Sequence, residues 1–190
     1  MTKRAILDAA KTLLWEQGFE SMSPRKVMDL SGAGQGSLYH HFRSKQDLAD
    51  AALAEVESEL LAVAARLFAS DLAPLERIRA YLLLERNGLK GCRLGRLSNE
   101  GGVLGDEVLR GRLASYFSRI EEYLVAALDQ AQRDGAFRIP LESRDVAAAL
   151  AASVQGGFLL SRASADPQAI TRATRGAWQM LAGLSKNPSA

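Results

Sequence analysis

The sequence has a single cysteine among its 190 residues, which excludes an intrachain disulfide and makes a reducing cytoplasm the expected compartment. The N-terminus lacks the apolar core of a signal peptide. The longest alanine-rich apolar run, near residues 146–154, is far too short to span a bilayer. The alternating pattern of strands is also missing, and helical spacing dominates to the end. These absences predict an all-α cytoplasmic protein that makes no contact with a membrane.

Charge is only weakly informative, because the net charge is +2. Residues 1–46 contain seven Lys or Arg and four Asp or Glu, a balance of +3, and the remainder has a balance of −1. This mild asymmetry is compatible with an N-terminal part that binds nucleic acid, although a solvated surface explains it equally well. The hydrophobic fraction of 47% allows a real core, in one large domain or in a small domain fused to a larger helical one.

Two short helices joined by a turn are predicted between residues 22 and 45. The apolar face of the first comes from Val27, Met28 and Leu30. Residues 31–34 are too rich in small side chains to continue a helix and are expected to turn. The second helix, over residues 35–42, has Leu38 and Phe42 on one side and small or hydrogen-bonding residues on the other: Gly36, Ser37 and His40. Such a helix suits the major groove of DNA, where base edges offer donors and acceptors.

The residues after the turn are Gly36-Ser37-Leu38-Tyr39-His40-His41-Phe42, followed by Ser44-Lys45 and Leu48. This pattern closely resembles the recognition helix of TetR-family transcriptional regulators, which are dimeric helical repressors. The resemblance is specific across residues 4–48, and beyond them it depends on helix number and length. The family often has Ser-Lys where this chain has Gly34-Gln35. A Gly caps a helix nearly as well as Ser, but the missing Lys removes one phosphate contact.

Eight residues of this module are predicted to contact DNA: Arg25, Lys26, Gln35, Gly36, Ser37, Tyr39, His40 and Lys45. Arg25 and Lys26 begin a helix, where they are either phosphate contacts or ordinary exposed charges. By angle Gln35 lies toward Leu38 and Phe42, but a long side chain in the first turn of a helix can extend along the axis to a base. The resemblance places Gln35 at the DNA surface, and a Gln can pair with adenine through two hydrogen bonds. The Tyr39 hydroxyl is expected on a phosphate, the alternative being a half-buried core aromatic.

About nine helices are predicted in all, and the resemblance divides them into two domains. Residues 1–47 form a three-helix helix-turn-helix DNA-binding domain, and residues 48–190 form a larger helical domain for ligand binding and dimerisation. Ser44 to Asp47 matches a capping box that begins a long helix to about Phe68. Four further helices are expected over residues 74–87, 92–100, 107–134 and 143–163, with Asp106 and Ser143 capping the last two, and a final helix follows Asp166-Pro167 to about residue 184.

Small residues dominate the helix that begins near residue 143: Ala147, Ala148, Ala149, Ala151, Ala152, Gly156 and Gly157. Small side chains let helix backbones approach closely. The resemblance implies that the last two helices form a four-helix interface with those of a second copy, whereas ordinary packing within one chain is the alternative. A two-fold dimer would place two recognition helices on successive major grooves of a palindromic operator, about 34 Å apart.

The resemblance also implies a small-molecule pocket in the middle helices. Its candidate lining is Tyr81, Cys92, Asn99, Tyr116, Tyr123, Gln155, Phe158 and Arg162, although the aromatic residues can equally be core and Arg162 solvated. The segment Gly91-Cys92-Arg93-Leu94-Gly95 resembles the start of the sixth helix in a TetR subgroup that senses reactive compounds. A thiol near a helix start and an Arg would have a lowered pKa, but a buried and inert cysteine is the alternative.

The sequence therefore predicts a ligand-responsive, homodimeric DNA-binding regulator that a small molecule releases from its operator, most simply a repressor. The alternative is a helical ligand-binding or scaffold protein with a vestigial DNA module, which would show no salt-dependent DNA binding. An enzyme ranks last, because no nucleophile–base pair, metal-ligand spacing or phosphate-binding glycine loop is present. No cofactor or metal is expected.

Overall fold

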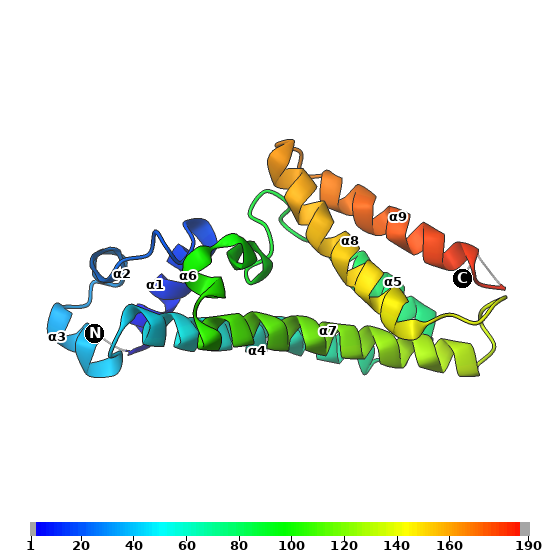
Figure 1. The fold of residues 1–190 in the computed structure, drawn as a ribbon, viewed down its shortest axis with the longest axis horizontal. Coiled ribbons are helices and arrows are strands. Elements are labelled where there is room, and N and C mark those ends of the chain that lie inside the picture. Colours follow the sequence, from blue (N-terminus) through cyan, green and yellow to red (C-terminus); the bar gives the residue numbers. More distant parts are fainter. Residues whose placement is uncertain (1–2, 187–190) are drawn as a thin grey trace. The chain divides into compact units, whose positions relative to one another are not determined.

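The computed structural model describes residues 3–186, and within them the chain is built from helices (Figure 1). The described part contains nine α-helices and one short 3₁₀ helix, and an isolated bridge joins Phe137 to Ser185. The helices are α1 (Lys3–Glu16), α2 (Pro24–Ser31), α3 (Gln35–His41), α4 (Lys45–Phe68), α5 (Pro74–Leu82), η1 (Gly95–Asn99), α6 (Gly101–Leu104), α7 (Glu107–Arg133), α8 (Ser143–Ala163) and α9 (Ala169–Gly183). The predicted all-α class is confirmed.

The chain forms two compact units. The first contains the described residues up to Leu60 together with Cys92–Tyr116, and the second contains Leu61–Gly91 and the described residues from Phe117 onward. The chain passes from one unit to the other three times, twice within the continuous helices α4 and α7. The boundary predicted after residue 47 concerns function and stays a prediction.

Helix α1 supplies the core of the first unit. Its residues Ile6, Ala10 and Leu14 recur at helical spacing and are buried. Gly18 ends the turn after the helix with φ at +87°, a conformation that favours glycine, and Phe19 then packs into the core.

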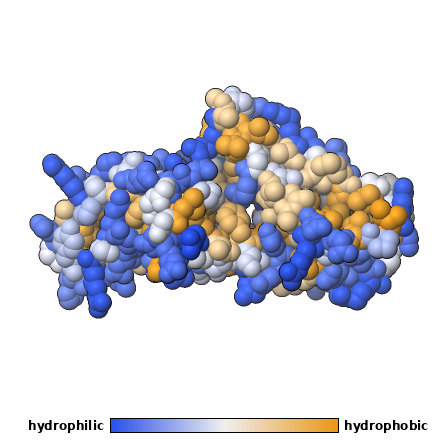
Figure 2. Space-filling model, in the orientation of Figure 1, coloured by the Kyte–Doolittle hydropathy of each residue, from blue (hydrophilic) through white to orange (hydrophobic). Residues whose placement is uncertain are grey.

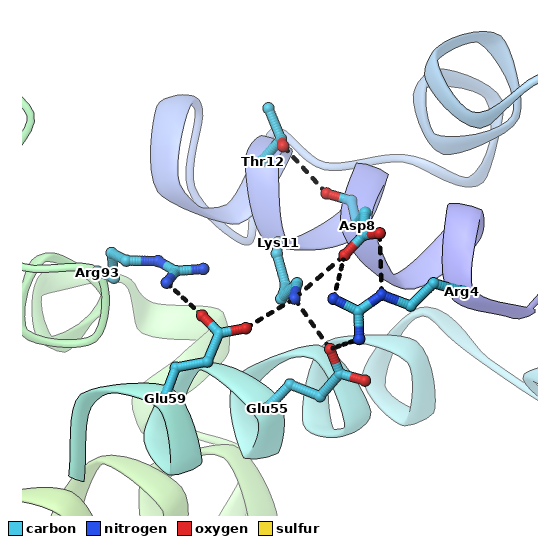
Figure 3. Close-up of polar contacts among 7 residues, drawn as sticks. All are labelled: Arg4, Asp8, Lys11, Thr12, Glu55, Glu59 and Arg93. Atoms are coloured by element: carbon cyan, nitrogen blue, oxygen red, sulfur yellow. Dashed lines mark hydrogen bonds and ion pairs between the residues drawn. The ribbon is translucent and has the colours of Figure 1, made fainter. Parts of the chain in front are cut away.

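A buried lysine ties α1 to α4. Lys11 is 8% exposed. Its Nζ lies 2.9 Å from Glu55 Oε2, 2.9 Å from Glu59 Oε1 and 3.1 Å from Asp8 Oδ1 (Figure 3). A buried ammonium is tolerable only when it is paired. These three carboxylates supply the pairing, so their positions fix how α1 lies on α4.

Two arginines complete this cluster of alternating charges. Arg4 pairs with Asp8 at 2.9 Å, and Arg93 pairs with Glu59 at 2.6 Å (Figure 3). A hydrogen bond from Arg4 lowers the pKa of Asp8, and a hydrogen bond from Lys11 lowers the pKa of Glu59. The cluster thus also connects the segment that follows Cys92 to α1.

The predicted helix over residues 74–87 is too long, because α5 ends at Leu82. The Arg86 guanidinium explains the early end. It donates to the carbonyl oxygens of Tyr81 at 2.6 Å, Leu82 at 2.9 Å and Leu84 at 3.0 Å. The terminal carbonyls of α5 therefore find a side-chain donor and need no further helical turn.

Three other predicted boundaries are also wrong. No helix begins at Cys92; the 3₁₀ helix η1 begins at Gly95, and Gly101 begins α6 instead of ending a helix. Ser143 does not cap α8, because Glu142 occupies that position. The Ser143 hydroxyl is instead buried, donating to Asp129 Oδ1 at 2.5 Å and accepting from Gln132 Nε2 at 2.9 Å.

Helices α8 and α9 pack closely in the second unit. A Cβ on Gly157 would lie 2.9 Å from the Cα of Ile170, and the Ser161 hydroxyl accepts a hydrogen bond from the Ile170 amide at 3.0 Å. Although the run noted in the sequence is short, α8 as a whole has 21 residues and mean hydropathy 1.3 over its most apolar window. By length and composition alone it could cross a membrane.

We expect Lys11→Met to lower the free energy of unfolding by about 1–2 kcal/mol, because the partly exposed Glu55 and Glu59 lose a partner but keep water. The pH dependence gives a sharper test. A carboxyl group whose pKa is lower in the folded protein stabilises it at pH above the ordinary values of 3.8 and 4.5 for Asp8 and Glu59. That contribution disappears as pH falls below them.

Urea unfolding at pH 7 and at several values between 3 and 5 measures this. The acid loss of stability should be steeper in wild type than in Lys11→Met. Equal slopes would show that Lys11 does not hold these carboxylates ionised.

Candidate DNA-binding site

Helices α2 and α3 form a helix-turn-helix. The Ser23 side chain caps α2 by accepting from the Lys26 amide at 3.3 Å, and Pro24 takes the first helical position. Gly32 ends α2 with φ at +69°, and its amide donates to the Met28 carbonyl at 2.8 Å. A residue with a side chain would be strained there. Because the chain turns sharply at Gly32, α3 can begin at Gln35, with Gly34 as its N-cap.

Two apolar side chains anchor α3. Leu38 and Phe42 are each 3% exposed, so the side predicted to face the core does so. In α2, by contrast, only Val27 is buried. Met28 is half-buried and Leu30 is 54% exposed, so the prediction that Leu30 belongs to the apolar face is wrong. Val27 and Leu30 are only about 60° apart around α2, but Leu30 lies in the last turn of the helix, where its side chain is exposed.

The opposite side of α3 is open. Gln35, Gly36, Tyr39 and His40 are exposed, and Ser37 is half-buried. A Cβ added to Gly34 or to Gly36 would meet nothing within 4 Å. Packing within the chain therefore does not explain either glycine. The absence of side chains leaves room for another molecule to approach the backbone of α3 closely.

The cations near α3 fall into two groups. Lys26 Nζ is occupied by Gln17 Oε1 at 2.7 Å and the Ser21 carbonyl at 2.9 Å. Lys45 Nζ donates to the Glu20 carbonyl at 3.2 Å and lies 4.4 Å from the centre of the Phe19 ring. Both lysines predicted to bind phosphate thus already have partners inside the protein.

Two arginines near the helix-turn-helix have exposed side chains with no partner among residues 3–186. One is the predicted Arg25 at the start of α2, and the other is Arg43, which directly follows α3. Sequence reasoning passed over Arg43 because it lies outside the quoted pattern. Its position directly after Phe42, the residue that caps the end of α3, is the sequence feature that places Arg43 beside the recognition helix.

The residues after Arg43 fix the start of α4. The Ser44 hydroxyl accepts from the Asp47 amide at 3.0 Å, which confirms the predicted cap. The Asp47 carboxylate accepts in return from the Arg43 amide at 2.8 Å. This exchange ties the residues that connect α3 and α4 to the first turn of α4.

The predicted ligand-binding residues are distributed over both compact units. Cys92, Asn99 and Tyr116 belong to the first, and the second contains Tyr81, Tyr123, Gln155, Phe158 and Arg162. Cys92, Tyr81, Tyr116 and Phe158 are buried, whereas Asn99 and Arg162 are exposed and Tyr123 and Gln155 are half-buried. Tyr123 lines a cleft. The predicted ligand role of this set stays a prediction, as does the sensing role of Cys92.

Two family models match the chain. The model described as "Bacterial regulatory proteins, tetR family" matches residues 6–52, which include α2, α3 and the start of α4. The model described as "Tetracyclin repressor-like, C-terminal domain" matches residues 74–177. The two matches together cover most of the described chain.

Individual proteins agree with the family models. The nucleoid occlusion factor SlmA of Vibrio vulnificus is 29% identical over 163 residues, 82% of this chain and 81% of the relative. The HTH-type transcriptional repressor DhaR of Mycobacterium sp. (strain GP1) is 25% identical over 160 residues, 83% and 80% of the two chains.

Solved structures show the same fold. A TetR-family transcriptional regulator from Agrobacterium tumefaciens superposes with a TM-score of 0.84 at 27% identity, over 93% of this chain and 95% of that one. The reduced form of NemR from E. coli superposes with a TM-score of 0.80 at 23% identity, over 98% of each chain, and shows the fold alone. The subgroup suggested by the Gly-Cys segment stays a prediction.

We expect Leu38→Ala to destabilise the protein by about 2–5 kcal/mol, because it empties a buried site beneath α3. Tyr39→Ala on the open side should change the free energy of unfolding by no more than about 0.5 kcal/mol. Urea unfolding followed by circular dichroism compares the two variants. A larger loss for Tyr39→Ala than for Leu38→Ala would mean that the two sides of α3 are assigned the wrong way round.

Proposed function

This chain belongs to the TetR family of bacterial regulatory proteins, and we propose that it is a homodimeric repressor released from a palindromic operator by a small molecule. The family establishes a ligand-responsive DNA-binding regulator that is not an enzyme. The observation that supports the site is the open side of α3, which leaves polar side chains and uncrowded glycines outward while Leu38 and Phe42 lie in the core.

Bases are read from the first two turns of α3. Gln35 occupies the first helical position and is exposed, so its amide can form the two hydrogen bonds that adenine offers in the major groove. His40 lies further along the helix, on the side opposite Leu38. Gly36 lets the helix backbone come close to DNA, and Ser37 and Tyr39 offer hydroxyl groups to base edges or phosphates.

Phosphates are bound first by Arg25 and Arg43. These exposed guanidinium groups have no partner in the described chain, so they lose no internal contact on binding DNA. Lys26 and Lys45 must exchange or share their internal partners, and each therefore contributes less per charge. In this proposal the four cations flank α3 and fix its depth in the groove.

The dimer forms through α8 and α9. Orange and pale-orange side chains gather over these two helices in Figure 2. Leu159 is 63% exposed, Leu160 55% and Met180 71%, and Ala148 and Ala152 are exposed on α8. Gly156 and Gly176 would place a Cβ in open space, so packing within the chain does not require them. Covering this surface with a second copy accounts for the apolar character of α8 in a DNA-binding family.

The small residues of α8 therefore form a stripe that serves two purposes. Ala147, Ala151 and Gly157 are buried against the rest of the chain, whereas Ala148, Ala152 and Gly156 remain available to the second copy. Close backbone approach on both sides of one helix explains why nearly every residue of the stripe is small.

Release follows from linkage. A ligand lowers operator affinity only if it binds the DNA-incompetent arrangement more tightly, and the operator then lowers ligand affinity by the same factor. Helix α4 is continuous from Lys45, beside α3, to Phe68 in the second unit. It supplies the covalent path between the two sites.

Binding to DNA from beside the protein's own gene, measured over a salt series, tests the DNA contacts. We expect each of Arg25→Ala and Arg43→Ala to reduce the slope of log K against log salt concentration by about 1. Lys26→Ala and Lys45→Ala should reduce it less. Arg144→Ala, an exposed arginine at the start of α8, is the matched control and should leave it unchanged.

Salt-independent binding, or no binding even to random duplex at low salt, would instead indicate a vestigial DNA module. Equal slopes for wild type and both arginine variants would remove these two phosphate contacts from the account.

Sedimentation at micromolar concentration tests the dimer. The double variant Leu159→Glu with Met180→Glu should be monomeric, because it places charges in the apolar surface, and its operator affinity should fall by about a hundredfold or more. Val108→Glu introduces the same charge at an apolar side chain that is 58% exposed on α7 and should remain dimeric. A dimer that survives the double variant would place the interface elsewhere.

A further inference from the structure

A cleft of about 350 Å³ lies within the second unit, between the end of α4, α5 and α7. Its volume is at the lower end of the range for small-molecule sites. Alanines form much of its wall: Ala65, Ala69, Ala126 and Ala127. Because these side chains are short, the cleft has a flat apolar surface with room beside it.

Aromatic rings form the inner end of the cleft. The rings of Phe68 and Tyr123 are nearly parallel, with an interplanar angle of 8° and centroids 5.5 Å apart. The buried Tyr81 ring also packs against Phe68, with centroids 5.6 Å apart, and helps to hold that ring in place. A fixed pair of rings beside flat alanine surface favours a planar, aromatic guest.

The only charged residue that lines the cleft is a cation. Arg77 Nε donates to the Leu72 carbonyl at 2.8 Å, while Nη1 reaches Gln130 Oε1 only at the long distance of 3.4 Å. No carboxylate lines the cleft. The outer N–H groups of Arg77 therefore have no ion pair in the described chain, and a guanidinium fork of this kind matches a carboxylate.

Two neutral polar groups lie beside that cation. The Gln130 side-chain amide NH2 group and the Tyr123 hydroxyl make no hydrogen bond within residues 3–186, and both residues line the cleft. They can donate to the second oxygen of an acid bound at Arg77. A flat apolar wall, a ring pair and a cluster of donors around one cation thus converge on one small volume.

We propose that this cleft is the effector site and that it takes a planar aromatic carboxylate of one or two rings. The ring lies against the alanines and the Phe68–Tyr123 pair, and the carboxylate binds Arg77 and Gln130. This inference rests on the proposed function for its regulatory meaning, since Ala65 and Phe68 belong to α4, the helix that begins beside α3 at Lys45. A guest in the cleft therefore contacts that helix directly, at Ala65 and Phe68.

Calorimetric titration of the purified full-length protein, without DNA, tests the site itself. Benzoate and 2-naphthoate should each bind saturably, with one molecule per protomer. Benzamide keeps the ring and removes the charge, and cyclohexanecarboxylate keeps the charge and removes the flat ring. The dissociation constant of each should be at least about tenfold higher than that of benzoate.

Variants then locate the binding. Arg77→Gln should weaken benzoate by about tenfold or more. Arg79→Gln is the matched control, because Arg79 lies on the same helix, pairs with Glu76 at 3.2 Å and does not line the cleft; its affinity should stay within about twofold of wild type. Ala126→Leu fills the cleft from an exposed position and should abolish binding. This second variant keeps the test valid if Arg77→Gln fails to fold.

Operator binding with and without benzoate completes the test. Benzoate should release DNA from wild type and Arg79→Gln but not from Arg77→Gln. The proposed site is overturned if neither benzoate nor 2-naphthoate binds, or if Arg77→Gln and Ala126→Leu bind benzoate as tightly as wild type does. Binding in the cleft without release of DNA overturns its effector role. A protein that binds no DNA at all contradicts the proposed function instead, because the calorimetry does not involve DNA.

Discussion

A helix of seven residues does not persist in water by itself, so α3 depends on what holds it. Leu38 and Phe42 supply that hold by lying in the core on one side, and Gly32 supplies the sharp exit from α2 that brings α3 into place. The remaining side of α3 carries no structural duty. Its residues are therefore available for contacts with another molecule, and the rest of the first unit keeps them in position.

The charges around this module divide between architecture and binding. Lys11, with its three carboxylates, fixes α1 against α4, and Arg93 extends that cluster to the segment after Cys92. Lys26 and Lys45 both donate to carbonyl oxygens in the segment between α1 and α2. Arg25 and Arg43 alone among the cations flanking α3 in the described chain are left unpaired. Counting basic residues would not have separated these groups, because their sequence positions look alike.

The helices that carry caps and regular apolar spacing could be predicted from sequence. Ser44 and Asp106 begin helices as expected, and Ser23 caps α2 in the same way, because a cap is a local interaction between neighbours in the chain. The end of α5 and the role of Ser143 could not, because they depend on the Arg86 side chain folding back and on Asp129 and Gln132 of α7. Helical periodicity also predicted Leu30 on the buried face of α2, although its side chain is exposed, because a short helix has too few turns for the pattern to define which residues the core covers.

The candidate sites show the same division. Spacing within α3 predicts Gly36, Ser37 and His40 on its open side, whereas Gln35 lies toward Phe42 by angle and only the resemblance placed it at the DNA surface. The cleft at Arg77 brings together α4, α5 and α7, and of its lining only Tyr123 was singled out from sequence. Whether an arginine is paired depends on residues distant in the chain, as Gln130 is from Arg77.

Hydroxyl-radical footprinting on operator DNA tests the central claim, that two copies of α3 enter successive major grooves of one duplex. The account predicts two protected half-sites related by two-fold symmetry, with centres about 34 Å or 10–10.5 base pairs apart, and the loss of both in a Gln35→Ala, His40→Ala double variant. A single unsymmetrical patch, or a footprint that the double variant leaves intact, would contradict it.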